Sequence, residues 1–190
     1  MVRVMKINQL LVMVLTVLLM AISGSVIASE NIDKAVKACA ACHGANGVSN
    51  NGQWPNLAGQ KEQYLISQIN AFRNGSRSDA LMNASVQGLS DKQVAAIARY
   101  FSSLKREQNV PGDLALEGLN VRARCVSCHG MNGRTVNTEW PNLAGQKYEY
   151  VKKQLMDFKS GARKSPIMEV IANELNDEQI AAVADHYSKL

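Results

Sequence analysis

The chain contains two copies of a short cluster of side chains that could bind a cofactor covalently. Each copy reads Cys-x-x-Cys-His, and the copies comprise Cys39, Cys42 and His43, and Cys125, Cys128 and His129. On a helix, positions i, i+3 and i+4 share one face. Two thiols on that face can bond to the vinyl groups of a haem while the imidazole reaches the iron, which is the c-type attachment pattern. Because the motifs use all four cysteines and two of the three histidines, the sequence predicts two covalent c-type haems.

Other uses of four cysteines agree less well with this pattern. A thioredoxin-like dithiol needs a βαβ setting, which the chain does not indicate. A four-cysteine zinc site would have to join two motifs that lie far apart in the sequence, and it would leave both histidines unexplained. A plain disulfide framework does not require a histidine directly after the second cysteine. These alternatives remain weaker than haem attachment.

A methionine follows each motif at the same separation. Met82 follows His43 at the same interval in the sequence as Met168 follows His129. A single methionine is more often a core residue than a ligand. The matched spacing nevertheless favours Met82 and Met168 as the second axial ligands of the two haem irons. Histidine and methionine ligation together are typical of electron-transfer cytochromes, and the thioether raises the reduction potential.

The two motifs belong to a tandem duplication. Residues 39–104 align with 125–190 at a constant offset of 86, and 29 of the 66 aligned pairs are identical. The longest identical segment is WPNLAGQK, at 54–61 and 140–147. The remaining histidine, His186, aligns with Tyr100, so we expect a packing or surface role for it. We predict one domain at residues 29–108 and a second at 109–190, since Pro111 and Gly112 interrupt helical continuity between them.

The elements that must position these side chains are predicted to be helices. Helices at 32–41 and 114–127 would carry the cysteines, and helices at 60–74 and 146–160 show apolar residues near helical spacing. A last helix begins after Ser90 and after Asn176, each followed three positions later by glutamine, as in a capping box. Gly44 and Gly130 should allow a tight exit from each haem helix. No segment alternates with a strand period for long, so we expect an all-α fold.

The segment at 1–28 has the pattern of a secretory signal peptide. Arg3 and Lys6 precede an apolar run at 10–22, and small residues lead to a predicted cleavage after Ala28. The alternative is an uncleaved membrane anchor, but the apolar run is short for a span of about 20 residues. We therefore expect an exported protein that works outside the cytoplasm, where thiols tend to be oxidised.

Charge limits the classes of partner. The whole chain has a net charge of +5, without the Lys/Arg cluster that a nucleic-acid binder usually shows. Residues 29–110 hold nine basic and six acidic residues, whereas residues 111–190 hold ten of each. We expect no nucleic-acid partner, and we expect acidic partners to favour the first half.

The haem motifs, the doubled PNLAGQ and the methionine before each last helix resemble the dihaem cytochromes c of the c4 type. This resemblance covers residues 29–190. It implies two class I cytochrome c domains related by pseudo-symmetry, each wrapped around one covalent haem. It implies an electron carrier rather than an enzyme, located in the periplasm as part of a bacterial respiratory chain. Electrons would arrive from a quinol-oxidising complex or another donor and leave to a terminal oxidase or another acceptor. Peripheral association with the membrane is compatible with this role.

The same resemblance implies roles for residues around the haems. The carbonyls of Pro55 and Pro141 would accept the N–H of the ligand histidines, although a rigid turn alone could explain these prolines. Other repeated residues are expected to line or seal the haem pockets, namely Trp54, Trp140, Tyr64 and Tyr150. Arg77 and Arg163 would either pair with haem propionates or stay solvated.

Two further functions remain open from the sequence. A dihaem peroxidase or a thiosulfate-oxidising cytochrome would need one iron with a vacant or displaceable ligand, which the matched Met82 and Met168 disfavour. A tethered subunit of a larger oxidase or dehydrogenase would differ from a free carrier in its partner more than in its chemistry.

Overall fold

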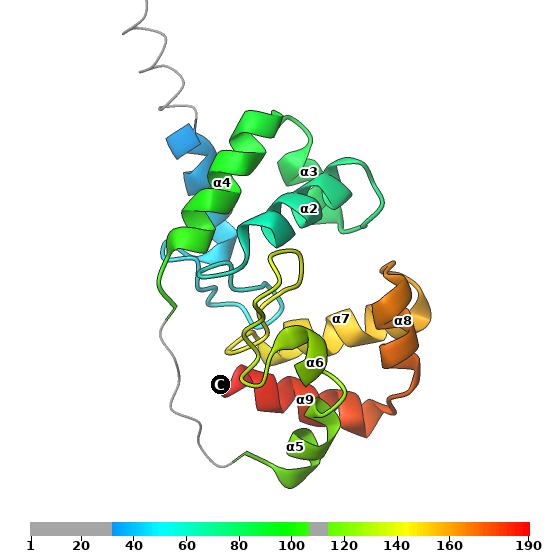
Figure 1. Ribbon diagram of the computed structural model, residues 1–190. Helices are drawn as coiled ribbons and strands as arrows, with labels where there is room; N and C mark the ends of the chain where they lie inside the picture. The colour runs from blue at the N-terminus through cyan, green and yellow to red at the C-terminus, as the bar shows by residue number, and fades with distance from the viewer. Residues whose placement is uncertain (1–31, 107–113) are drawn as a thin grey trace, which may run out of the picture.

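The computed structural model describes residues 32–106 and 114–190. The predicted signal peptide, 1–28, and the predicted domain boundary at 108/109 lie outside the described residues. Within those two ranges the chain forms helices and turns without a β-strand, as the all-α prediction requires. Figure 1 shows two groups of helices, one from each repeat, with the C-terminus at the end of α9 in the second group.

The first half is built around the packing of α2 on α4. It contains a helix at residues 32–43, α2 (Glu62–Arg73), α3 (Ala80–Val86) and α4 (Asp91–Ser103). Helix α2 also contacts α3. The buried core consists of Val36, Leu65, Ile97, Ala98 and Phe101. The predicted helices at 32–41 and 60–74 are therefore present, with ends shifted by one or two positions.

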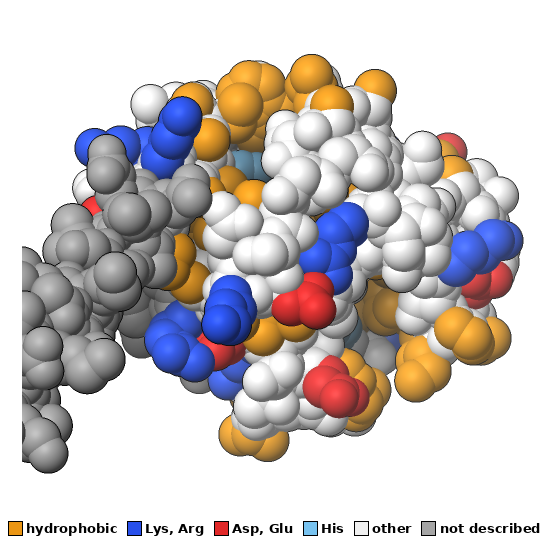
Figure 2. All heavy atoms as spheres, turned by 90° about the horizontal axis from the view of Figure 1, so that it is seen from above, with side chains coloured by type: hydrophobic (Ala, Val, Ile, Leu, Met, Phe, Trp, Pro, Cys, Tyr) orange, Lys and Arg blue, Asp and Glu red, His pale blue; other side chains and the backbone are white. Residues whose placement is uncertain are grey.

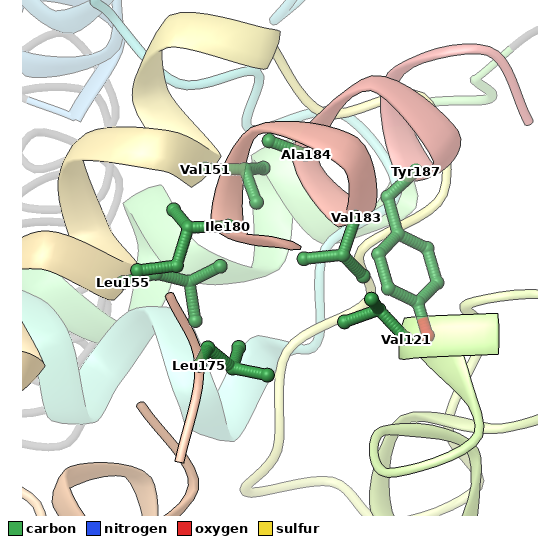
Figure 3. Packing of buried hydrophobic residues seen from close by; sticks show 8 residues of the cluster. All are labelled: Val121, Val151, Leu155, Leu175, Ile180, Val183, Ala184 and Tyr187. Atoms are coloured by element: carbon green, nitrogen blue, oxygen red, sulfur yellow. The ribbon is translucent and has the colours of Figure 1, made fainter. Parts of the chain in front are cut away.

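The second half has the same arrangement with one break. It contains α5 (Leu116–Arg122), α6 (Val126–His129), α7 (Tyr148–Ser160), α8 (Pro166–Asn173) and α9 (Asp177–Ser188). Helix α9 packs against α5 and α7, and α7 contacts α8. The core here comprises Val121, Val151, Leu155, Leu175, Ile180, Val183, Ala184 and Tyr187, which Figure 3 shows from close by.

The prediction of one continuous helix at 114–127 is wrong. Helix α5 ends at Arg122, and a turn at residues 123–125 separates it from α6. In this turn the N–H groups of residues 123, 124 and 125 bond to the carbonyls three positions earlier, at 3.3, 3.2 and 2.8 Å. Such bonds tighten the backbone relative to an α-helix. The second haem motif therefore begins in the turn, whereas the first lies within a continuous helix.

Side-chain caps explain where the later helices begin. The capping boxes of Ser90 with Gln93 and of Asn176 with Gln179 are both present, as predicted. Helices α3 and α8 were not predicted. Asp79 accepts hydrogen bonds from the backbone N–H groups at the start of α3, and Ser165 does the same for α8. The sequence does contain a signal for these two helices, because Asp79 and Ser165 are good N-cap residues and each lies three positions before a matched methionine.

The halves meet through the two copies of the PNLAGQ loop. The Oε1 of Gln146 accepts from the backbone N–H of Asn56 at 2.8 Å, and its Nε2 donates to the carbonyl of Asn56 at 3.0 Å. The Asn56 amide in turn donates to the carbonyl of Gly145 at 3.1 Å. Asn56 and Gln146 are 4% and 5% exposed, so this contact excludes water.

The same contact is made a second time, between the glutamine of the first half and the asparagine of the second. The Oε1 of Gln60 accepts from the N–H of Asn142 at 2.8 Å, and its Nε2 donates to the Asn142 carbonyl at 3.0 Å. The Asn142 amide donates to the carbonyl of Gly59 at 3.0 Å. Each half thus offers one asparagine and one glutamine to the other, in the manner of a two-fold interface. We call these four residues the Asn–Gln clasp.

Candidate haem-binding sites

No disulfide bond joins any of the four cysteines of the two motifs. Cys42 is exposed, and Cys39, Cys125 and Cys128 are half-buried. Before a haem is attached, burial is the main cause that raises the pKa of the Cys39 and Cys125 thiols. Among the described residues no group of three or more His, Cys, Asp or Glu side chains is placed to hold a metal ion, which disfavours the zinc alternative.

Each motif histidine is held by a backbone carbonyl. The Nδ1 of His43 lies 2.9 Å from the carbonyl oxygen of Pro55, and the Nδ1 of His129 lies 2.9 Å from that of Pro141. A carbonyl can only accept, so Nδ1 carries the hydrogen and Nε2 keeps its lone pair. The prolines therefore do more than form a rigid turn, and the prediction of their carbonyl contacts is confirmed.

Burial also fixes the protonation state of these histidines. His43 and His129 are each 7% exposed. Burial lowers the pKa of both imidazoles, and the proline carbonyl opposes this only in part. A neutral imidazole with a free Nε2 is the form that ligates iron. A carbonyl on the other ring nitrogen is the usual way in which a protein orients such a ligand.

A glycine lets the chain turn sharply after each histidine. Gly44 and Gly130 have φ angles of 87° and 80°. A Cβ atom on Gly44 would lie 2.0 Å from the carbonyl oxygen of Val48, and one on Gly130 would lie 2.2 Å from that of Arg134. No other residue fits here without a backbone shift, so the predicted tight exit is confirmed at both sites.

The matched methionines lie at equivalent places on the two short helices. The backbone N–H of Met82 bonds to the Asp79 carboxylate at 3.0 Å, and that of Met168 bonds to the Ser165 hydroxyl at 3.4 Å. Both side chains are half-buried, and Met168 packs against the core of the second half. The unmatched Met131 is 65% exposed. The matched pair therefore differs in setting from a surface methionine.

The repeated arginines and tyrosines meet across the interface between the halves. The Nη2 of Arg77 donates to the Tyr150 hydroxyl at 2.9 Å and to the Gln154 Oε1 at 2.7 Å. Arg163 repeats this with Tyr64 at 3.0 Å and Gln68 at 2.8 Å. Each arginine also bonds to the glutamine of its own half, at 2.7 Å for Arg77 and 2.6 Å for Arg163. We call these six residues the Arg–Tyr cluster.

This cluster corrects one expectation from the sequence. A solvated role for Arg77 and Arg163 is wrong, because both guanidinium groups bond across the interface and lie over the rings of Phe72 and Phe158. Burial raises the pKa of Tyr150, but the charges of the two arginines outweigh it and the pKa is lowered overall. The cluster was missed because no local pattern shows which half a side chain faces.

The remaining aromatic residues and the third histidine have simpler settings. His186 is 2% exposed and packs edge-to-face on Tyr187, with ring centroids 5.2 Å apart, so its predicted packing role is confirmed. Trp54 and Trp140 are not fully buried. Figure 2 shows histidine surface within recesses bordered by hydrophobic side chains. Histidine surface bordered by apolar side chains is a setting that suits a haem.

Comparison with known proteins shows the family. A family model described as cytochrome c matches residues 29–105 and again residues 117–189. Cytochrome c4 of Pseudomonas aeruginosa is 35% identical over 167 residues, which cover 80% of this chain and 83% of the relative. The chain belongs to the cytochrome c4 family. The crystal structure of reduced cytochrome c4 from Pseudomonas stutzeri matches with a TM-score of 0.78 and 32% identity, covering 85% of this chain and 97% of that one.

Membership of the cytochrome c4 family settles the class of protein. The chain is an electron-transfer protein rather than an enzyme, it binds two covalent c-type haems, and it folds as two tandem cytochrome c domains. A "thiosulfate dehydrogenase electron acceptor" of Thiomonas intermedia is 36% identical over 163 residues, covering 77% of this chain and 75% of the relative. None of the helices in the described ranges is long and apolar enough to cross a membrane.

Proposed function

We propose that this cytochrome is an exported carrier that moves single electrons through two six-coordinate haems. The thioether bonds are assigned to Cys39, Cys42, Cys125 and Cys128, and the axial ligands are His43 with Met82 and His129 with Met168. The observation that carries the proposal is the paired contact of each histidine Nδ1 with a proline carbonyl at 2.9 Å. It leaves one oriented Nε2 in each half, and a methionine follows each histidine at the same separation in the sequence.

The side chains of this protein would hold the redox groups without binding a substrate. When bound, each haem supplies a one-electron ferric–ferrous couple. The proline carbonyls keep the imidazoles in one orientation. His43 with Met82 and His129 with Met168 would hold the two irons, so that no substrate would need to bind the metal. The Asn–Gln clasp would keep the two sites in a fixed relation, so that electrons could pass between the halves.

The Arg–Tyr cluster supports a role near acidic groups of the cofactor. Arg77 and Arg163 share the neutral acceptors Gln68 and Gln154. No ion pair with a carboxylate is found for either arginine within the described part of the chain. The charge of Asp157 helps to raise the pKa of Arg163, whereas the hydrogen-bond acceptors of Arg77 are all neutral, which favours an anion near Arg77. Pairing with haem propionates therefore remains part of the proposal.

Export to the periplasm is supported by the segment at 1–28. Signal peptidase would release a chain that begins at Ser29, and the loss of Arg3 and Lys6 would lower its net charge from +5 to +3. Mass spectrometry of the protein from a periplasmic extract tests this. A mass equal to residues 29–190 plus two haems supports export and cleavage. A mass that includes residues 1–28 would favour the tethered alternative.

Two classes of electron donor are considered. The first is a quinol-oxidising complex, with a terminal oxidase as acceptor, as expected for a respiratory carrier. The second is a thiosulfate-oxidising enzyme, which the name of the Thiomonas intermedia relative favours. Stopped-flow reduction of the oxidised cytochrome by each donor with its substrate distinguishes them. The physiological donor should reduce it on the time scale of its own turnover, through the weak and transient contact usual for redox partners.

The ligand assignment is tested by spectroelectrochemical titration of the wild type, Met82→Ala and Met168→Ala. We expect two one-electron waves in the wild type. Each variant should lose the ferric sulfur-to-iron band of its own haem, and the potential of that haem should fall because the thioether is gone. Met131→Ala is the matched control, because this methionine is exposed and has no counterpart in the first half. If Met82→Ala or Met168→Ala leaves both waves unchanged, the assignment is wrong.

A further inference from the structure

The two halves differ by a single hydroxyl group at a buried aromatic position. Phe101 in α4 and Tyr187 in α9 are equivalent at the offset of 86, and they are 0% and 1% exposed. Their backbone carbonyls accept from the N–H groups of Gly59 and Gly145 at 3.0 and 2.6 Å.

The two rings are held in the same way. A Cβ atom on Gly47 would lie 3.0 Å from the Cδ1 of Phe101, and one on Gly133 would lie 2.9 Å from the Cδ1 of Tyr187. Each ring therefore packs closely over the glycine of its own haem loop. The hydroxyl of Tyr187 is the feature that one ring has and the other lacks.

The hydroxyl of Tyr187 lacks a hydrogen-bond partner among the described residues. A buried donor without a partner is rare in proteins and calls for an explanation. Figure 3 shows the ring beside Val121, in the core cluster against which Cys125 packs. Cys125 and Tyr187 thus pack in the same cluster, and the neighbouring Cys125 adds to burial in raising the pKa of Tyr187. In the first half Cys39 packs against the cluster that holds Phe101, which has no donor to offer.

We propose that Tyr187 is a positioning residue that raises the reduction potential of the second haem relative to the first, by donating its hydroxyl hydrogen toward the sulfur of Cys125. The inference rests on the proposed function, in which that sulfur is a thioether of the haem. A thioether sulfur accepts weakly, and in a dry interior the positive end of an O–H dipole favours the state with the added electron. Hydrogen bonds around the ligands of a haem are an established means of setting its potential. The step is a one-electron reduction of iron, in which no bond breaks and no proton moves.

The chain provides a matched pair of substitutions for the test. Tyr187→Phe gives the second half the residue of the first, and Phe101→Tyr does the reverse. In a spectroelectrochemical titration of the holoprotein, Tyr187→Phe should lower the ferrous-to-ferric ratio of the second haem at fixed potential roughly 3- to 10-fold, which is about 30–60 mV for one electron. Phe101→Tyr should shift the first haem by a similar factor in the opposite direction. The waves are assigned with Met82→Ala and Met168→Ala.

Two further measurements separate this inference from the proposed function. The haem content, from the pyridine haemochrome spectrum, should be two per chain in every variant, and near-native thermal unfolding should show that the ring still packs. If both haems are present and the second wave does not move in Tyr187→Phe, or both waves move equally, the role of Tyr187 is wrong. If the wild type contains fewer than two haems, the proposed function itself fails.

Discussion

The guanidinium of Arg77 in the first half bonds to the hydroxyl of Tyr150 in the second at 2.9 Å. Arg163 bonds in the reverse sense to Tyr64 at 3.0 Å. The arginine–tyrosine hydrogen bond is thus made twice across the interface, once in each direction. A duplicated domain can preserve such a contact only if each copy keeps both the donor and the acceptor, as both halves do here.

Removal of Arg77 should destabilise the protein as a whole. Arg77→Met would leave the Tyr150 hydroxyl without its donor, and Gln68 and Gln154 would each keep only the hydrogen bond from Arg163. Each hydrogen bond lost from a charged donor costs about 1.5–3 kcal/mol. The free energy of unfolding, measured with urea on the holoprotein, should fall by about 2–4 kcal/mol. Arg99→Ala is the control, because Arg99 has a 74% exposed side chain and a 3.5 Å ion pair with Glu62. It should change stability by about 0–1 kcal/mol.

A double-mutant cycle tests whether the pair itself is responsible. Arg77→Met and Tyr150→Phe should be less harmful together than the sum of the single variants, with a coupling of about 0.5–3 kcal/mol. Additive effects would show that the bond across the interface contributes little.

The Arg–Tyr cluster marks the limit of what the sequence predicts. Repetition identified Arg77, Arg163, Tyr64 and Tyr150 as significant, but it could not say which half each side chain faces. By contrast, the cysteine and histidine motifs were predictable from their spacing, and the contact of His43 with the Pro55 carbonyl followed from the resemblance to a known family. Local geometry is encoded in spacing, whereas the contact between two domains depends on how their surfaces fit together.

Disruption of the Asn–Gln clasp should uncouple the unfolding of the halves. Asn56→Ala removes the amide that donates to Gly145 at 3.1 Å and the Oδ1 that accepts from the N–H of Ser49 at 2.9 Å. We expect a loss of about 1–3 kcal/mol for the buried groups left unpaired. Calorimetry of the wild type should show one transition. Asn56→Ala combined with Asn142→Ala should show two, and persistence of a single transition would contradict the role of the clasp.

The clasp could have been suspected from the sequence. Asn56 and Gln60 are polar loop residues that are identical in both copies, although solvated loops usually vary more than the elements they connect. The short helices α3 and α8 were harder to predict, since helices of only two turns give little helical periodicity. The break before α6 depends on the tight turn at residues 123–125, for which the sequence has neither glycine nor proline as a marker.

Substitution of the glycine after the haem histidine should prevent formation of the holoprotein. Gly44→Ala would place Cβ 2.0 Å from the Val48 carbonyl, at a φ of 87°. The loop must move, and His43 would lose its position against Pro55. Gly75→Ala is the matched control, because its φ is 77° but a Cβ there meets nothing within 4 Å. We expect a stability loss of about 1–2 kcal/mol for Gly75→Ala with both haems retained. Haem content per chain is the measurement, and full incorporation in Gly44→Ala would contradict the prediction.

Protonation of His186 should destabilise the second half at acid pH. The ring is 2% exposed and neither nitrogen has a hydrogen-bond partner among the described residues. Burial and the charge of Arg122 lower the pKa of this histidine below its usual 6.5, and Asp185 opposes them only in part. Between the lowered pKa and 6.5 the unfolded chain binds more protons than the folded one, so stability rises with pH. The stabilising contribution is present above pH 6.5 and is lost as the pH falls below it.

His186→Phe isolates this effect, because the carboxylates titrate in both proteins and cancel in the comparison. Melting temperatures of the two holoproteins should be compared at pH 8 and pH 5. On acidification the melting temperature of the wild type should fall further than that of the variant. In a chain of this size, each 1 kcal/mol of stability lost on protonation of His186 corresponds to about 2–4 °C. Tyr100, the equivalent residue in the first half, is 38% exposed, so Tyr100→Phe serves as the control. If the difference in melting temperature between the wild type and His186→Phe is the same at pH 8 and pH 5, protonation of His186 does not affect stability and the prediction is wrong.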